Sequence, residues 1–333
     1  MRCDRIAKNF WAVIRLNFVA ALNETAASNL RVLEEQIRQA IADDPFIFEA
    51  CAPLFKGGKR LRPMLFLLCA NAKADCPPER TMPLAVALEL IHTASLVHDD
   101  IIDTAKKRRG VETANSKYGA QIAVLVGDYL FAKAFQLVAE NNYGAEVSTV
   151  LSKLVKNLCV GEITQDRSLF TVPTLTEYYT RINLKTAIFL SSCCRLGAIV
   201  ADMDNHEVDN LTAYGSGLGL AFQIIDDLLD FFGDEKVTGK PRGGDLKSGV
   251  ITLPVIRALE VSNDAPTLRA IVTKGDDVDA AIKIIQATDA VDYCRTRAEA
   301  HIDSARINLP ITLKTSVALA LEKIADFIVD RTR

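Results

Sequence analysis

Long helical stretches without proline are the feature of this 333-residue chain that most restricts its fold. Apolar residues recur at helical spacing in residues 24–42, 84–103, 117–140, 145–168, 175–201, 207–232, 277–306 and 312–331. Alternating runs bounded by hairpin turns, which would predict strands, are scarce. The pattern therefore predicts an all-α protein, a bundle of about ten or more helices.

No linker or low-complexity segment divides the chain, so we expect residues 1–333 to form a single domain. Residues 1–23 are a special case, because Phe10 to Leu22 is apolar yet interrupted by Arg15 and Asn17. This run is too short to span a bilayer. Two interpretations remain open: a peripheral amphipathic helix that packs on the body, or a helix that lies on a membrane surface.

The net charge of -3 gives no general attraction to nucleic acid, so an anionic partner should be a small molecule. The eight cysteines contain no Cys-x-x-Cys pair and lie mostly among apolar residues. That usage is typical of small buried side chains in a reducing compartment and argues against a zinc site. We therefore expect a cytoplasmic protein, either fully soluble or peripheral to the membrane.

The motif Asp-Asp-x-x-Asp occurs twice, as Asp99, Asp100 and Asp103 and as Asp226, Asp227 and Asp230. Each copy closes a long apolar helical stretch, and its first and last aspartates share one helix face. Carboxylates at the C-terminal end of a helix repel one another and oppose the helix dipole. One cluster could be a solvated helix end, but two with identical spacing favour a hard cation such as Mg²⁺ that bridges carboxylates to a substrate phosphate.

Basic groups that could hold such phosphates lie near both clusters in the sequence: Lys59, Arg62, Arg108, Arg109, Lys185 and Lys240. Arginine forks match diphosphate oxygens, and lysine adds a point charge. Lys185 stands among apolar residues, where a lysine is costly without a partner. His92 lies seven residues before Asp99 and so faces the same side of the helix. For the pair at residues 108 and 109, a plain surface charge remains the alternative.

Taken in order, these motifs resemble those of the trans-type polyprenyl diphosphate synthases, from about residue 25 to the end. The matching segments are Gly-Gly-Lys-Arg-Leu-Arg-Pro (57–63), Leu-Val-His-Asp-Asp-Ile-Ile-Asp (96–103), Arg-Arg-Gly (108–110), Gly-Asp-Tyr-Leu (127–130), Lys-Thr-Ala (185–187), Phe-Gln-Ile-Ile-Asp-Asp-Leu-Leu-Asp (222–230), Gly-Lys-Pro (239–241) and Asp-Leu-Lys-Ser-Gly-x-x-Thr-Leu-Pro (245–254). The ordered set is very specific, whereas no single segment is. The segment at 245–254 is most similar to long-chain synthases of octaprenyl or solanesyl type, which make quinone side chains.

The resemblance implies a helical bundle around a central cavity, a homodimer, and about two or three Mg²⁺ ions per site. It implies that the main magnesium ligands are Asp99, Asp103 and Asp226, supported by Asp100, Asp227 and Asp230. It assigns the allylic diphosphate to Arg108, Lys185, Thr186, Gln223 and Lys240, and isopentenyl diphosphate to Lys59, Arg62, His92 and Arg109. The implied reaction is successive head-to-tail condensation, in which Lys185 and Thr186 also help to stabilise the allylic cation.

This chain departs from the family pattern at Gly249-Val250, where many members have Gly-Lys and hence a second diphosphate lysine. The departure puts in doubt how tightly the allylic diphosphate is held. Thr104 stands where an acidic residue is common, which is a minor difference.

Product length should depend on the residues one turn before Asp99, about 6 Å below it on the helix. These are Ala94 and Ser95, both small, so the path of a growing chain looks open. We expect a product of roughly C40–C45. Small residues chosen only for helix packing remain the alternative.

Other functions also remain open from the sequence. They are a geranylgeranyl or farnesyl synthase, a terpene cyclase, a non-catalytic subunit of a heteromeric synthase, and a di-metal oxidase. The second set of basic residues argues against a cyclase, the two complete aspartate clusters argue against a non-catalytic subunit, and the lack of Glu-x-x-His pairs argues against an oxidase.

Overall fold

The computed structural model describes residues 24–55, 58, 60–108, 110–232 and 242–330. Helices dominate this part of the chain, which confirms the predicted all-α class. The strands within it are β1 (Lys107–Arg108) and β2 (Val111–Glu112), which pair antiparallel as a small ribbon. The predicted N-terminal peripheral helix lies outside the described residues.

The helices follow one another with short connections. The first half of the chain forms α2 (Glu24–Ala40), α3 (Pro45–Cys51), η1 (Ala52–Phe55), α4 (Leu61–Ala70), α5 (Pro78–Ile102), α6 (Ala114–Tyr118), α7 (Ala120–Glu140) and α8 (Gly144–Arg167). The second half forms α9 (Leu175–Ile182), η2 (Asn183–Ala187), α10 (Ile188–Val200), α11 (Asn205–Phe232), α13 (Gly244–Lys247), α14 (Leu253–Val261), α15 (Ala265–Lys274), α16 (Val278–Gln286), α17 (Ala290–Ile307) and α18 (Thr315–Asp330).

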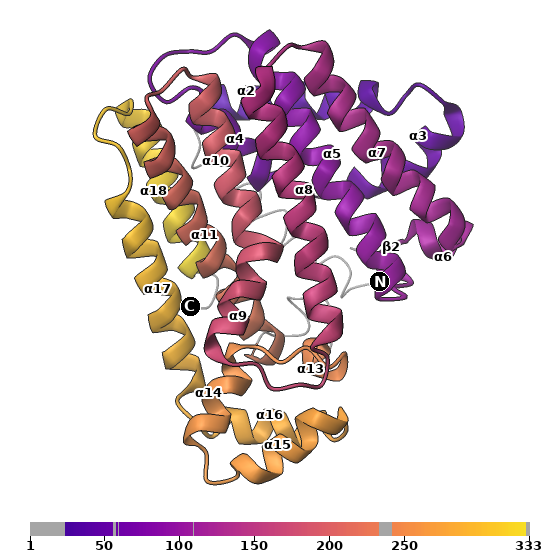
Figure 1. Ribbon diagram of the computed structural model, residues 1–333, viewed down its shortest axis with the longest axis vertical. Helices are drawn as coiled ribbons and strands as arrows, with labels where there is room; N and C mark the ends of the chain where they lie inside the picture. The colour runs from indigo at the N-terminus through magenta and orange to yellow at the C-terminus, as the bar shows by residue number, and fades with distance from the viewer. Residues whose placement is uncertain (1–23, 56–57, 59, 109, 233–241, 331–333) are drawn as a thin grey trace.

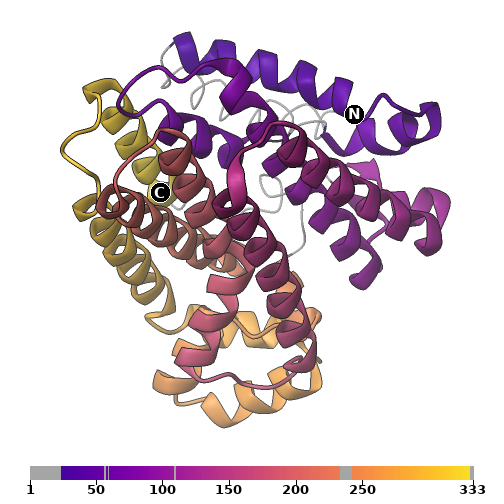
Figure 2. The same cartoon turned by 45° about the horizontal axis from the view of Figure 1, so that its top comes forward.

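Long helices pack side by side as a bundle in which α11 contacts both α10 and α17 (Figure 1). The helix α4 packs against both α10 and α5, and α5 in turn packs along α7. The short helices α14, α15 and α16 gather at one end, as the tilted view in Figure 2 also shows. The core is continuous and almost entirely aliphatic, with a few fully buried aromatic side chains such as Tyr178 and Tyr214.

Most predicted helices differ from the structure by a few residues at their ends, and two of them differ more. The stretch 277–306 is not one helix, because α16 ends at Gln286 and α17 begins at Ala290. The helix expected at residue 84 begins earlier, at Pro78, where a proline fits the first turn because its missing N–H would have no helical partner.

The predicted helix over 175–201 contains a π-helical turn, η2, at Asn183–Ala187. Such turns often mark functional sites, because they redirect the side chains that follow. At η2 the helix α11 comes very close: a Cβ on Gly219 would lie 2.4 Å from the Cα of Ala187. Only glycine permits that approach. The close approach therefore places the end of η2 directly against α11.

Three helical stretches are long and apolar enough to cross a membrane by length and composition: Pro78–Ile102, Ala120–Glu140 and Leu175–Val200. The protein buries 72% and 67% of the most apolar part of the first and third stretches, but only 33% of the second. The second is α7, where Val124 and Leu125 remain 42% and 57% exposed. This helix thus presents an uncovered apolar face.

Candidate active site

The first aspartate cluster lies at the C-terminal end of α5. Asp99 is half-buried, Asp100 is buried and Asp103 is exposed. Burial raises the pKa of Asp99 to about 6, and the negative charges of Glu162 and Asp103 add to the rise. The carboxylate of Asp99 therefore lies in an environment that a cation would stabilise.

Arg108 is anchored to the first cluster by an ion pair. Its Nε donates to Oδ1 of Asp100 over 2.8 Å, and the side chain of Asp100 is only 2% exposed. The β1–β2 ribbon brings Arg108 back towards α5, and its charge lowers the pKa of Asp99. The sequence predicted Arg108 as a site residue but not the ribbon that orients it.

The second cluster lies at the C-terminal end of α11. Asp226 is exposed, while Asp230 is half-buried and accepts the backbone N–H of Asp245 at its Oδ2, over 3.1 Å. Asp227 is buried, and both of its carboxylate oxygens accept hydrogen bonds. Its Oδ1 accepts Nε2 of Gln223 (2.8 Å), and its Oδ2 accepts the hydroxyl of Tyr178 (2.7 Å). Burial raises the pKa of Asp227 to about 7.

The two clusters therefore have the same arrangement of buried and exposed aspartates. In each, the middle aspartate turns inward and is held by protein groups, with Asp100 and Asp227 only 2% and 3% exposed. The first and last aspartates lie on the adjacent, more exposed face, as the helical spacing predicts. Each cluster thus has one buried carboxylate that is held by the protein and two that are more exposed.

Lys185 and Thr186 in η2 connect the two clusters. Nζ of Lys185 lies 2.9 Å from Oε2 of Glu162, and its charge is close enough to Asp99 to lower the pKa of that carboxyl. The hydroxyl of Thr186 donates to Oε1 of Gln223 over 2.6 Å, on the side of the second cluster. Two consecutive residues therefore lie near different clusters, Lys185 near Asp99 and Thr186 against Gln223, the partner of Asp227.

Two residues predicted to bind isopentenyl diphosphate also meet. Nη1 of Arg62 lies 3.3 Å from Nε2 of His92. The ring of Phe189 lies beside both, with its centroid 4.9 Å from Cζ of Arg62 and 5.9 Å from the centroid of the His92 ring. Lys59, Arg109 and Lys240 lie outside the described residues.

The sequence interpretation overlooked Arg60, which stands inside the basic motif but has a structural role. Its Nε and Nη1 bond Glu34 (2.9 Å) and Glu89 (2.7 Å), and Nη2 donates to the carbonyl of Phe55. The side chain is 3% exposed. The positive charge of Arg60 is thus neutralised by two glutamates within the protein. The guanidinium of Arg62, in contrast, lies beside His92.

Glu162, Tyr178 and Arg181 were also missed. Each contacts a site residue or the chain near it: Lys185, Asp227 and the carbonyl of Ile251, respectively. These partners are distant in the sequence, so local spacing could not have found them.

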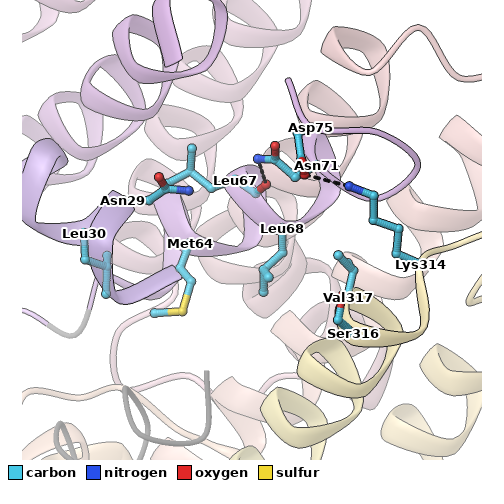
Figure 3. A pocket seen from close by; sticks show the side chains of 10 residues that line it. All are labelled: Asn29, Leu30, Met64, Leu67, Leu68, Asn71, Asp75, Lys314, Ser316 and Val317. Atoms are coloured by element: carbon cyan, nitrogen blue, oxygen red, sulfur yellow. Dashed lines mark hydrogen bonds and ion pairs between the residues drawn. The ribbon is translucent and has the colours of Figure 1, made fainter. Parts of the chain in front are cut away.

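The pocket shown in Figure 3 is a different feature. It has a volume of about 160 Å³, lies between α2, α4 and α18, and has none of the predicted site residues in its lining. The lining residues are Asn29, Leu30, Met64, Leu67, Leu68, Asn71, Asp75, Lys314, Ser316 and Val317.

The donor set of the clusters fits a hard cation, because it consists of carboxylate oxygens alone. Among the described residues, no three His, Cys, Asp or Glu side chains converge into a group that could hold a metal ion.

The all-helical fold and its paired aspartate clusters define the class of helical prenyltransferases. A family model described as Polyprenyl synthetase matches residues 44–288. The chain belongs to this polyprenyl synthetase family, and the predicted resemblance is confirmed.

Three relatives of this chain are named after products of different chain length. Heptaprenyl diphosphate synthase component 2 of Geobacillus stearothermophilus is 39% identical, with 86% of this chain and 90% of the relative covered. Solanesyl-diphosphate synthase 2, chloroplastic, of Oryza sativa is 35% identical, with 94% and 80% covered. The short chain isoprenyl diphosphate synthase of Methanocaldococcus jannaschii is also 35% identical, with 91% and 94% covered.

Two solved structures have the same fold. The decaprenyl diphosphate synthase of Rhodobacter capsulatus gives a TM-score of 0.86 at 33% identity, with 93% of this chain and 98% of that chain covered. The polyprenyl synthase of Caulobacter crescentus, complexed with calcium and isoprenyl diphosphate, gives 0.85 at 31% identity, with 95% and 98% covered.

Proposed function

We propose that this prenyltransferase is a magnesium-dependent, long-chain all-trans polyprenyl diphosphate synthase, which adds isopentenyl units to an allylic diphosphate. The observation that carries the proposal is the η2 turn, where Lys185 is near Asp99 while Thr186 bonds Gln223 beside Asp227. A diphosphate bound between the two aspartate clusters would therefore contact both Lys185 and Thr186.

In this proposal Asp99, Asp103 and Asp226 hold the metal, which when bound supplies positive charge to the leaving diphosphate. Lys185 and Arg108 add cationic charge at the same end of the site. Arg62 with His92 would hold the second substrate, isopentenyl diphosphate, and so orient its double bond for attack on the allylic carbon. The aliphatic interior excludes water, which would otherwise capture the allylic cation.

The assay is direct. The purified chain, given isopentenyl diphosphate, an allylic primer and Mg²⁺, should release diphosphate, and EDTA should stop the release. Asp99→Ala and Asp226→Ala should each lower turnover by at least about 100-fold with the fold intact by circular dichroism. Asp209→Ala, which removes an exposed carboxylate paired with Arg195, is the control and should keep full turnover. Near-normal turnover of both cluster variants would reject the proposal.

A product of roughly C40–C45 is supported by the small residues Ala94 and Ser95 one turn before Asp99. The names of the heptaprenyl, solanesyl and decaprenyl relatives support a long product, whereas the short-chain relative is just as similar to this chain as the solanesyl enzyme. Reversed-phase chromatography of the dephosphorylated products decides between them. A C15 or C20 end product would favour the shorter-chain alternative.

A homodimer is supported by the apolar face of α7 and by exposed apolar residues on the next helix, α8. Leu125 is 57% exposed on α7, and Ile163 is 58% exposed on α8. Sedimentation velocity should show a dimer, and Leu125→Glu with Ile163→Glu should give monomers. Leu319→Glu, at a 56% exposed leucine of α18, is the matched control and should leave the dimer intact.

A heteromeric enzyme is the second candidate, because the Geobacillus relative is named as component 2 of a synthase. The same assay separates the two cases. Full chain elongation by the purified chain alone supports the homomeric enzyme, and activity that appears only with a second polypeptide supports the heteromeric one.

A further inference from the structure

Tyr178 is a fully buried residue for which the proposed chemistry has no direct use. Its side chain is 0% exposed in the core, and its hydroxyl donates to Oδ2 of Asp227 over 2.7 Å. A buried phenol needs an acceptor, but a backbone carbonyl would serve. In this protein the acceptor is instead the middle carboxylate of the second aspartate cluster.

A chain of hydrogen bonds continues from that carboxylate to η2. Nε2 of Gln223 donates to Oδ1 of Asp227, and Oε1 of the same amide accepts the hydroxyl of Thr186. When ionised, the Asp227 carboxylate only accepts, which matches the amide nitrogen presented to Asp227 and the amide oxygen presented to Thr186. The position of Asp227 therefore decides the orientation of Gln223 and, through it, the orientation of the Thr186 hydroxyl.

The helix that carries Tyr178 is itself well anchored. Arg181, one turn further along α9, is buried and donates to the carbonyl oxygen of Ile251 over 2.6 Å. Ile251 follows α13, the short helix whose Asp245 N–H bonds Asp230. The helix α9 is therefore tied both to α11 at Asp227 and to the chain that follows α13.

We infer that Tyr178 is a positioning residue that sets the allylic-diphosphate side of the site through Asp227, Gln223 and Thr186. This inference rests on the proposed function and deepens it. It predicts an asymmetry between the substrates, because Arg62 and His92 lie on other helices, α4 and α5. Loss of the Tyr178 hydroxyl should weaken the allylic side and leave the isopentenyl side almost unchanged.

The test compares Tyr178→Phe with Tyr214→Phe. Tyr214 is the matched control: it is also 0% exposed, and its hydroxyl also donates over 2.7 Å, but to the backbone carbonyl of Leu321. Each substrate is varied in turn for kcat and KM, and calorimetry measures the binding of a non-reacting allylic thiolodiphosphate with Mg²⁺. Thermal melting verifies that both variants fold.

For Tyr178→Phe we expect kcat/KM for the allylic diphosphate, and the affinity for the thiolodiphosphate, to fall about tenfold. KM for isopentenyl diphosphate should stay within about twofold. Tyr214→Phe should change none of these values. In a Gln223→Met background, which already breaks the chain, Tyr178→Phe should cost little more.

Three results would overturn the inference: wild-type allylic binding in Tyr178→Phe, an equal loss for both substrates, or additive losses in the Gln223→Met background. If the wild-type protein showed no turnover, the proposed synthase function would fail by itself. The thiolodiphosphate titration would still decide whether Tyr178 affects diphosphate binding.

Discussion

Nη1 of Arg62 lies 3.3 Å from Nε2 of His92, although the two residues are 30 positions apart in the chain and belong to α4 and α5. Phe189 of α10 places its ring beside both groups. Three helices thus meet at one cationic group, and the Phe189 ring lies within cation–π distance of the guanidinium.

Arg62→Lys tests the role of this arrangement. Lysine keeps the charge but loses the fork that can hold a diphosphate and the stacking on Phe189. We expect KM for isopentenyl diphosphate to rise about tenfold or more, with KM for the allylic primer changed by less than about twofold. Steady-state kinetics with each substrate varied in turn makes the comparison. A larger effect on the primer would reverse the assignment of the two pockets.

Ser95→Phe should shorten the product. Ser95 is half-buried on the face of α5 that also carries His92 and Asp99, so an aromatic ring there would obstruct a chain growing from the aspartates. Chromatography of the products measures the change, and an unchanged length distribution would contradict it.

Ala94→Phe provides the contrast. Ala94 is 0% exposed, so a ring must displace its packed neighbours, at a cost of about 1–3 kcal/mol. We therefore expect a lower thermal midpoint for Ala94→Phe than for Ser95→Phe, in addition to any shortening. Equal midpoints would mean that the two sites are packed alike.

Asp227→Asn should stabilise the metal-free protein at high pH. Burial raises the pKa of Asp227 from 3.8 to about 7, so between these values the native state holds a proton that the unfolded chain has lost. Stability therefore falls as pH rises through this window. Asparagine cannot ionise, its amide oxygen can still accept the hydroxyl of Tyr178, and the amide of Gln223 can turn to accept from its nitrogen.

Thermal melts in EDTA at pH 5 and pH 8 make the measurement. The difference between the two midpoints should shrink in Asp227→Asn, and its midpoint at pH 8 should exceed that of the wild type. Some pH dependence should remain, because Asp99 also has its pKa raised by burial, to about 6. A lower midpoint than the wild type at pH 8 would contradict the prediction.

Arg60→Met should destabilise the fold strongly. Removing the guanidinium leaves Glu89, which is 4% exposed, without its 2.7 Å partner, and breaking a buried ion pair in this way costs about 3–5 kcal/mol. Arg80→Met is the control, because the Arg80–Asp202 pair is exposed and contributes about 0–1 kcal/mol. Urea denaturation compares the two, and similar losses would mean that Arg60 is not a structural anchor.

The helical class, the two aspartate clusters and the exposed faces of those clusters could be predicted from the sequence. Helical periodicity is local, and residues four apart on a helix share a face whatever the rest of the chain does. The break at 287–289 and the early start at Pro78 were missed, because helix ends depend on packing more than on periodicity.

The sequence by itself determined which side chains are available for the site. The carboxylates, the arginines and Lys185 all stand in motifs that can be recognised in the sequence. Only the tertiary structure decided how they are used. It turned Asp100 and Asp227 inward, assigned Arg60 to a buried ion pair, and joined Tyr178 to the second cluster. These choices depend on groups that are far apart in the chain and that meet only when helices pack, because burial makes each polar group require a partner.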